Sequence, residues 1–158
     1  MEADRVGRKL SAILAADVSG YSRLMSDDEE GTLASLNAHL REQIVPAVER
    51  FRGRVVKTTG DGLLAEFPSV VDAVRSAVEI QTGMAERNAA IAADKRLDFR
   101  IGINVGDIVE QDGDIFGEGV NIAARLEGIA EPGGICVSER VREDVEGKIA
   151  LPFEDAGE

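Results

Sequence analysis

VVKTTGDGLLAEF, residues 55–67, places two apolar, β-prone runs on either side of a Gly60-Asp61-Gly62 turn. Glycine supplies positive φ and aspartate tolerates turns, so this pattern predicts a β-hairpin. Lys57 lies four residues before Asp61. Asp61 is therefore either a turn residue only or a metal ligand held at the tip of a rigid hairpin, and the stretch alone leaves both readings open.

Hydrophobic periodicity predicts the elements on both sides of the hairpin. Before the hairpin they are a strand ending near Asp17, a helical turn after Gly20 and a helix at 28–51 kinked by Pro46. After it come a helix from Pro68 to about Ala93 and a half-buried strand at 97–109 with its turn at 110–114. The chain then continues with a helix at 119–130, a strand at 133–138 and a helix at 139–147. This order, with two hairpins, predicts an α+β fold in which helices pack on one sheet.

Length and composition indicate a soluble globular protein. The chain has 158 residues, which suits one domain with a sizeable core, and it is 44% hydrophobic and 30% charged. Its apolar run AILAADV is far too short to span a bilayer and lacks the layout of a signal peptide. We therefore expect a cytoplasmic location, either as a soluble domain or as part of a larger or membrane-attached protein, with no membrane contact by the domain itself.

The charge balance restricts the partners. Eighteen basic residues against thirty acidic ones give a net charge of −12. Sequence-independent binding to nucleic acid needs a basic surface, so no nucleic-acid partner is expected. A phosphate-bearing ligand would be repelled unless metal ions and a few placed cations reversed the local field.

Asp17 and Asp61 are the first candidates for chemistry. Asp17 ends one predicted strand and Asp61 lies at the hairpin tip, so the two carboxylates converge if those strands are neighbours. Paired carboxylates on rigid backbone suit Mg²⁺. The alternative is that each aspartate merely shapes its own turn.

The segment Val18, Ser19, Gly20 and Tyr21 offers backbone N–H groups that could bind phosphate, although its glycine is equally explained by the turn.

Two further pairs each allow a functional and a structural reading. Asn121 and Arg125 are four residues apart in a predicted helix, so their side chains share one face, which could bind an oxyanion. The alternative is that Arg125 is simply solvated. Lys57 and Asp114 lie in or beside turns and could read the edge of a base or form a weak surface ion pair. His39 lies off the apolar stripe of its helix, so it is expected to be solvated.

In combination these residues resemble the catalytic domain of class III nucleotidyl cyclases. The resemblance runs from about Lys9 to the end, so residues 1–8 are interpreted as a tail and 9–158 as the catalytic domain. Four blocks carry it: ILAADVSGYSRLM (13–25), GRVVKTTGDGLLAEF (53–67), RIGINVGDIV (100–109) and GDIFGEGVNIAARLEGIAEPGGICVSE (113–139). The fold that it implies is a ferredoxin-like α+β sandwich with an antiparallel-rich sheet.

The resemblance also implies a role for each candidate. Asp17 and Asp61 would bind two Mg²⁺ or Mn²⁺ ions, Lys57 and Asp114 would select adenine, Asn121 and Arg125 would be catalytic, and Val18, Ser19, Gly20 and Tyr21 would form the phosphate loop. The implied reaction is adenylate cyclase activity, in which the 3′-hydroxyl of ATP attacks the α-phosphorus to give 3′,5′-cyclic AMP and pyrophosphate.

The family's active sites lie between two chains, so a head-to-tail homodimer is expected. One chain would give the aspartates and the other the remaining four residues. Two alternatives stay open: a guanylate cyclase, and a non-catalytic nucleotide-binding regulatory module. The sequence ends at FEDAGE, so we expect the domain to be truncated before the family's last strand, with regulatory domains in the full-length protein.

Overall fold

The computed structural model describes residues 6–154 and 157, and within them the chain forms a six-stranded sheet with helices on both faces. The strand order is β2-β3-β1-β4-β5, and β6 pairs separately with β4. Every pairing is antiparallel except the parallel β4–β6 pair. The strands are β1 (Val6–Val18), β2 (Arg54–Thr58), β3 (Gly62–Phe67), β4 (Phe99–Gln111), β5 (Asp114–Phe116) and β6 (Ile135–Val137).

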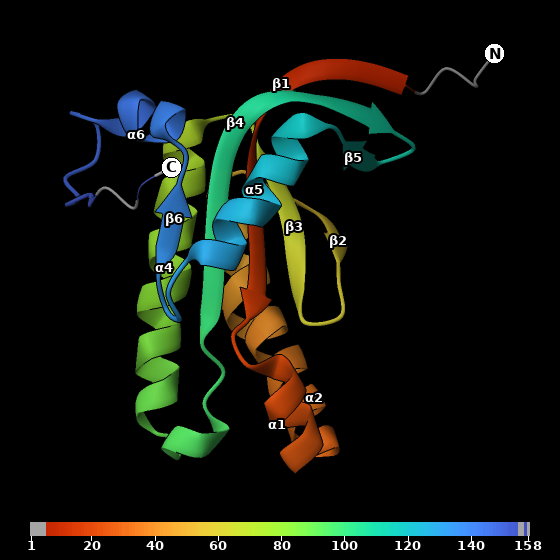
Figure 1. Cartoon of the computed structure of the whole chain (residues 1–158), viewed down its shortest axis with the longest axis vertical. Helices are drawn as coiled ribbons and strands as arrows, with labels where there is room; N and C mark the ends of the chain where they lie inside the picture. Colours follow the sequence, from red (N-terminus) through yellow and green to blue (C-terminus); the bar gives the residue numbers. More distant parts are fainter. Residues whose placement is uncertain (1–5, 155–156, 158) are drawn as a thin grey trace.

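The helices divide between the two faces of the sheet. They are α1 (Tyr21–Asp27), α2 (Glu29–His39), the π-helix η2 (Leu40–Ile44), α3 (Val45–Arg50), α4 (Val70–Ala89), the 3₁₀-helix η3 (Ala93–Lys95), α5 (Glu118–Ile129) and α6 (Glu139–Val145). The larger core joins one sheet face to α1–α4 and α6, and a smaller core joins the other face to α5. Figure 1 shows α5 lying across β4, with α4 beyond the opposite side of that strand. The predicted α+β sandwich is confirmed.

The predicted hairpin is confirmed as β2 and β3, with Arg54 opposite Glu66 and Thr58 opposite Leu63. The strand predicted to end near Asp17 ends at Val18, and it begins at Val6. Residues 1–5 of the expected tail lie outside the described residues. Over the part of the chain that the structure describes, no helix has both the length and the apolarity that a bilayer crossing requires.

The helix predicted at 28–51 forms as an unbroken helical run from Glu29 to Arg50 that contains a π-helical stretch. Asp28 caps α2 by accepting a hydrogen bond from the N–H of Gly31 at 3.0 Å. The chain then widens into η2 before α3, whose first turn contains Pro46. Proline has no N–H to donate one turn back, and the π-helical turn accommodates that interruption. Helix α4 ends at Ala89, about four residues earlier than predicted.

Strand β4 was predicted to be half-buried, and this is wrong for its first part. Phe99 and the residues from Ile101 to Val105 are buried, on both faces of the sheet, because α5 covers the second face. Gly102 makes this cover possible, since a Cβ there would lie 2.5 Å from the carbonyl oxygen of Ala123 in α5. The three-residue β5 was not predicted, because such a short run carries no periodic signal.

His39 is buried, so the expectation of a solvated histidine is also wrong. The residue is 3% exposed, and its Nδ1 accepts a hydrogen bond from Arg87 Nε at 2.9 Å. Burial, and then the Arg87 charge, lower the pKa of His39. A neutral imidazole is the form that can accept this bond.

Candidate active site

The sheet brings Asp17 and Asp61 together, as the sequence predicted for neighbouring strands. Asp17 on β1 lies opposite Gly62 on β3, and the next N–H along β1, that of Val18, donates to the carbonyl oxygen of Asp61 at 3.1 Å. A Cβ on Gly62 would collide with the carbonyl oxygen of Ala16, so only glycine permits this close approach. The Gly-Asp-Gly turn therefore fixes Asp61 beside the end of β1.

Arg100 is the counter-ion of Asp17. It lies opposite Asp17 on β4, and its Nε and Nη2 atoms donate to Asp17 Oδ1 and Oδ2 at 2.9 and 2.7 Å. The two side chains are 27% and 17% exposed, so the pair is largely shielded from water. A bidentate, charge-assisted pair of this kind is both strong and directional.

Glu127 is a third acidic group at this site. It projects from α5 on the face turned toward the sheet, where the charge of Asp17 acts on it. Burial, together with the negative charge of Asp17, raises the pKa of Glu127 to about 8. Burial and the Asp17 charge also raise the pKa of Asp61. Glu127 therefore keeps its proton near neutral pH, and Asp17 and Asp61 together carry more negative charge than Arg100 alone compensates.

This donor set fits a hard cation bound chiefly by two carboxylates. Within residues 6–154 and 157, no three His, Cys, Asp or Glu side chains are placed to hold a metal ion together. Carboxylate oxygens are the ligands that Mg²⁺ and Mn²⁺ prefer, and Mg²⁺ commonly takes one or two carboxylates plus substrate phosphates. The raised pKa of Asp61 marks a position where an added cation would be stabilised.

Lys57 and Asp114 meet across the two edge strands of the sheet, β2 and β5. Lys57 Nζ lies 3.1 Å from Asp114 Oδ2 and 6.0 Å from the centre of the Phe116 ring. Asp114 Oδ1 also accepts a hydrogen bond from the backbone N–H of Ile115 at 2.7 Å. That bond, and then Lys57, lower the pKa of Asp114. The two residues thus present an ammonium donor and a carboxylate acceptor side by side.

Asn121 and Arg125 lie on the outer surface of α5, and both are exposed. The Arg125 side chain is 72% exposed and lies 3.8 Å from Glu118. Ala123 and Glu127, two residues further along in each case, face the sheet. Because two residues turn a helix by about 200°, the Asn121–Arg125 face points away from the Asp17 cluster of its own chain.

The segment from Val18 to Tyr21 turns sharply between β1 and α1. Gly20 has φ of +69°, and the N–H of Ser19 donates to the carbonyl oxygen of Asp98 at 2.8 Å. The first N–H of α1 that bonds back is that of Leu24, to Gly20. The N–H groups of Val18 and Ser19 are thus engaged within the protein. The N–H groups in the first turn of α1 come before the first hydrogen bond inside the helix, so they have no partner within it.

Sequence reasoning missed Arg100 and Glu127, which complete the Asp17 cluster. A weak signal was available in each case, because each is a charged residue on a strand or helix face that is otherwise apolar or glycine-rich. Charged side chains are rarely buried without a partner. The partner, however, lies 83 residues away from Arg100 and could be found only from strand register.

The domain model described as "Adenylate and Guanylate cyclase catalytic domain" matches residues 8–157 of this chain. The chain belongs to this family. The resemblance drawn from the four sequence blocks is thereby confirmed. We can therefore consider three features as parts of a cyclase domain: the Asp17–Asp61 cluster, the Lys57–Asp114 pair and the exposed face of α5.

Two relatives and two solved structures illustrate the similarity. A Rhizobium meliloti (strain 1021) protein named "Putative adenylate cyclase 3" is 46% identical over 99% of this chain and 27% of its own length. An adenylate cyclase of Streptomyces coelicolor is 32% identical over 90% of this chain and 35% of its own length. The adenylate/guanylate cyclase/hydrolase of Silicibacter pomeroyi is 50% identical, with a TM-score of 0.91 over 96% of this chain and 88% of that one.

The adenylyl cyclase CyaB from P. aeruginosa is 24% identical, with a TM-score of 0.79 over 90% of this chain and 83% of that one. At that identity the likeness concerns the fold. The present chain spans about a third or less of the length of the two curated relatives. Activities of the longer proteins come to this chain only as proposals.

Proposed function

We propose that this domain is an adenylate cyclase that converts ATP into 3′,5′-cyclic AMP and pyrophosphate. The ion pair of Lys57 and Asp114, 3.1 Å apart, carries the choice of ATP over GTP. Adenine presents an amino donor beside a ring-nitrogen acceptor, whereas guanine presents a carbonyl acceptor beside an N–H donor. A carboxylate that accepts and an ammonium that donates match the adenine edge.

Asp17 and Asp61 would hold Mg²⁺ or Mn²⁺, two ions per site. Such ions, when bound, neutralise the triphosphate and lower the pKa of the attacking 3′-hydroxyl. The chain's own residues prepare the site. Arg100 orients the Asp17 carboxylate through both oxygens, and the closure of the turn at Gly62 fixes Asp61 beside it. The Val18–Tyr21 segment and the first turn of α1 are the proposed phosphate loop, with Gly20, Tyr21 and the next residues of α1 as its proposed N–H donors, since the N–H groups of Val18 and Ser19 are already engaged.

A head-to-tail homodimer would complete the site. Asn121 and Arg125 point away from the Asp17 cluster of their own chain and are exposed, so one chain does not gather all six residues. A second copy would bring its Asn121 and Arg125, with its Lys57 and Asp114, against the aspartates of the first. Arg125 would then stabilise charge on the reacting phosphoryl group and Asn121 would orient the ribose.

We also propose a cytoplasmic location and regulatory segments in the longer protein.

The test is a product assay with the purified chain. Incubation with ATP or GTP and Mn²⁺, at concentrations that favour a dimer, should yield cyclic AMP and pyrophosphate from ATP at a higher kcat/KM than cyclic GMP from GTP. A higher kcat/KM with GTP would establish a guanylate cyclase instead. Nucleotide binding without either cyclic product would establish the regulatory module.

Two variants test the metal assignment. Asp17→Ala and Asp61→Ala should each reduce turnover by at least about a hundredfold, because the removed carboxylate is a ligand of the ions that stabilise the transition state. Each should also remove the rise in melting temperature that Mn²⁺ causes in the unchanged chain. Asp27→Ala, at an exposed pair with Arg23 on α1, is the matched control. Near-normal turnover in either active-site variant would contradict the assignment.

A further inference from the structure

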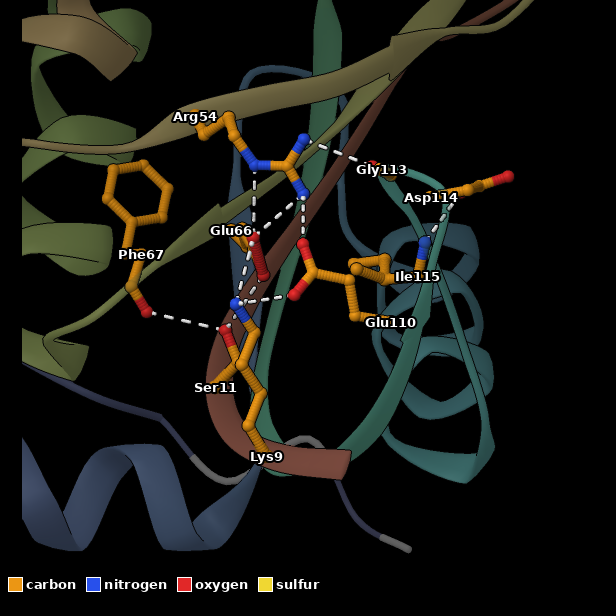
Figure 2. Close-up of polar contacts among 9 residues, drawn as sticks. All are labelled: Lys9, Ser11, Arg54, Glu66, Phe67, Glu110, Gly113, Asp114 and Ile115. Carbon is orange, nitrogen blue, oxygen red and sulfur yellow. Dashed lines mark hydrogen bonds and ion pairs between the residues drawn. The ribbon is translucent and has the colours of Figure 1, made fainter. Parts of the chain in front are cut away.

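A second charged cluster lies at the end of the sheet opposite Asp17, and Figure 2 shows its side chains converging on Glu66. Glu66 belongs to β3, and its side chain is only 9% exposed. Its carboxylate accepts from Arg54 Nη2 at 2.8 Å, from Arg54 Nε at 3.1 Å and from Ser11 Oγ at 3.4 Å, and Lys9 Nζ lies 3.4 Å away. A carboxylate this buried needs such partners, so Arg54 is firmly held at the start of β2.

The same guanidinium reaches a different part of the sheet. Arg54 Nη1 donates to the carbonyl oxygen of Gly113 at 3.0 Å, and Nη2 lies 3.5 Å from Glu110 Oε2. Gly113 forms the turn between β4 and β5 with Asp112, and both residues have positive φ. Strands β2 and β5 stand at opposite ends of the strand order, yet they contact one another because the sheet curls. Arg54 therefore links the two edges of the sheet.

Lys57 and Asp114 form a second link across the same junction. Lys57 lies three residues beyond Arg54 on β2, and Asp114 directly follows Gly113. Their side chains are 46% and 33% exposed. An exposed ion pair between flexible side chains fixes little geometry by itself. The backbone of Lys57 is held by its pairing with Leu64 on β3, and that of Asp114 by its pairing with Gln111 on β4. The contact of Arg54 with the Gly113 carbonyl joins these two edges of the sheet, one peptide before Asp114.

We propose that Arg54 is a positioning residue for purine selection. It ties the β4–β5 turn to β2 through Glu66 and the Gly113 carbonyl, so that the Asp114 carboxylate and the Lys57 ammonium stay matched to the adenine edge. This inference rests on the proposed function of Lys57 and Asp114. The hydrogen bonds of Arg54 go to Glu66, Glu110 and the Gly113 carbonyl, not to the Asp17 cluster, so it acts through the backbone of the turn and through its charge near Asp114.

The planar fork of arginine is central to this role. The edge of the guanidinium that carries Nε and Nη2 donates to Glu66 while Nη1 donates to the Gly113 carbonyl, and a lysine ammonium cannot span both partners with fixed geometry. Arg54→Lys keeps the positive charge beside buried Glu66, so it should fold, but it loses the directed contact to the turn. Arg54→Gln loses both. Arg8→Gln, at an exposed arginine of β1, is the matched control.

The experiment uses the whole chain and compares kcat/KM for ATP with kcat/KM for GTP. Arg54→Gln and Arg54→Lys should each lower the ATP preference about tenfold, within the range that one base-edge contact supplies. The loss should appear mainly as a higher KM for ATP, with a smaller change in kcat. Arg8→Gln should match the unchanged chain. A lower melting temperature with an unchanged preference in both Arg54 variants would overturn the inference and leave Arg54 a structural residue.

Binding measurements separate this inference from the proposed function. The ratio of the Kd values for GTP and ATP, measured by calorimetry with Ca²⁺ in place of Mn²⁺, needs no turnover. If the unchanged chain binds ATP selectively without forming cyclic AMP, the cyclase proposal fails, and a tenfold loss of selectivity in the Arg54 variants still supports the positioning role. If the unchanged chain does not discriminate between the two nucleotides, the positioning role is refuted.

Discussion

Arg100 binds both carboxylate oxygens of Asp17, with Nε 2.9 Å from Oδ1 and Nη2 2.7 Å from Oδ2. This pair joins β4 to β1 directly beside Asp61, so the proposed metal site contains an internal cation. The positive charge of Arg100 offsets part of the negative charge at this end of the sheet, where Asp17, Asp61 and Glu127 lie together in a chain of net charge −12. In the absence of metal, the fold depends on this arginine to balance the local charge.

Replacing this arginine should destabilise the metal-free protein. Arg100→Gln leaves Asp17 beside Asp61 and Glu127 without its counter-ion, and losing such a partly buried pair costs about 1–3 kcal/mol. For a domain of this size the melting temperature should fall by roughly 2–10 °C, measured by calorimetry in EDTA. Arg23→Gln, which removes an exposed pair with Asp27, is the control and should change little. Equal melting temperatures of Arg100→Gln and the unchanged chain would contradict this account.

Exchanging the Lys57–Asp114 pair should change purine preference. Lys57→Glu combined with Asp114→Ser replaces a donor and an acceptor by an acceptor and a hydroxyl, a set that suits the guanine edge better. We expect the ratio of kcat/KM for ATP over GTP to fall at least about tenfold. The two single variants show whether the residues act together, since coupled residues give non-additive changes. If the double variant keeps the full ATP preference, the pair does not select the base.

Local patterns were sufficient to predict the hairpin, the positions of the two aspartates at a strand end and a turn, and the shared face of Asn121 and Arg125, whereas the metal-binding role of the aspartates came from the family resemblance and stays a prediction. Each of these depends on spacing within a few residues, such as the two glycines around Asp61. The Lys57–Asp114 pairing required a second step, because its members lie 57 residues apart. Without the family resemblance, the sequence left an ion pair and a base-reading pair as equal alternatives, and the structure places the two side chains in contact.

Arg100, Glu127 and Arg54 could not be assigned from the sequence because their roles depend on register and curvature. Arg100 meets Asp17 only through the thirteen-residue pairing of β1 with β4. Arg54 meets Gly113 only because the curled sheet brings its two edge strands together. The burial of β4 on both faces was misjudged for the same reason, since α5 packs onto glycines that carry no hydrophobic signal.

That packing gives a direct stability prediction. A Cβ at Gly102 would collide with the backbone N–H of Glu127 and lie 2.5 Å from the carbonyl oxygen of Ala123. Backbone atoms cannot rotate away, so Gly102→Ala should destabilise the domain by about 1–3 kcal/mol or more, as overpacking does. Gly106→Ala on the same strand is the matched control, because its nearest contacts would be 3.6 Å away. Urea unfolding measures both, and equal midpoints would show that α5 is free to move outward.

Glu127 should make the stability of the metal-free domain depend on pH. Its pKa is raised to about 8 by burial and by Asp17, against an ordinary value of 4.5. The folded state therefore keeps a proton that the unfolded state releases as pH rises above about 4.5. Stability is fully present below that pH, falls between pH 4.5 and 8, and levels off above 8. The raised pKa of Asp61 adds a fall in the same direction.

Glu127→Gln isolates the contribution of this residue. The amide keeps a donor toward Asp17 and cannot ionise, so the variant should gain stability over the unchanged chain progressively from pH 5 to pH 8. Melting temperatures in EDTA across this range measure the difference. Glu131→Gln, an exposed position just beyond α5, should run parallel to the unchanged chain. If Glu127→Gln also runs parallel, Glu127 does not retain its proton in the fold, and the negative charge beside Asp17 must be balanced in another way.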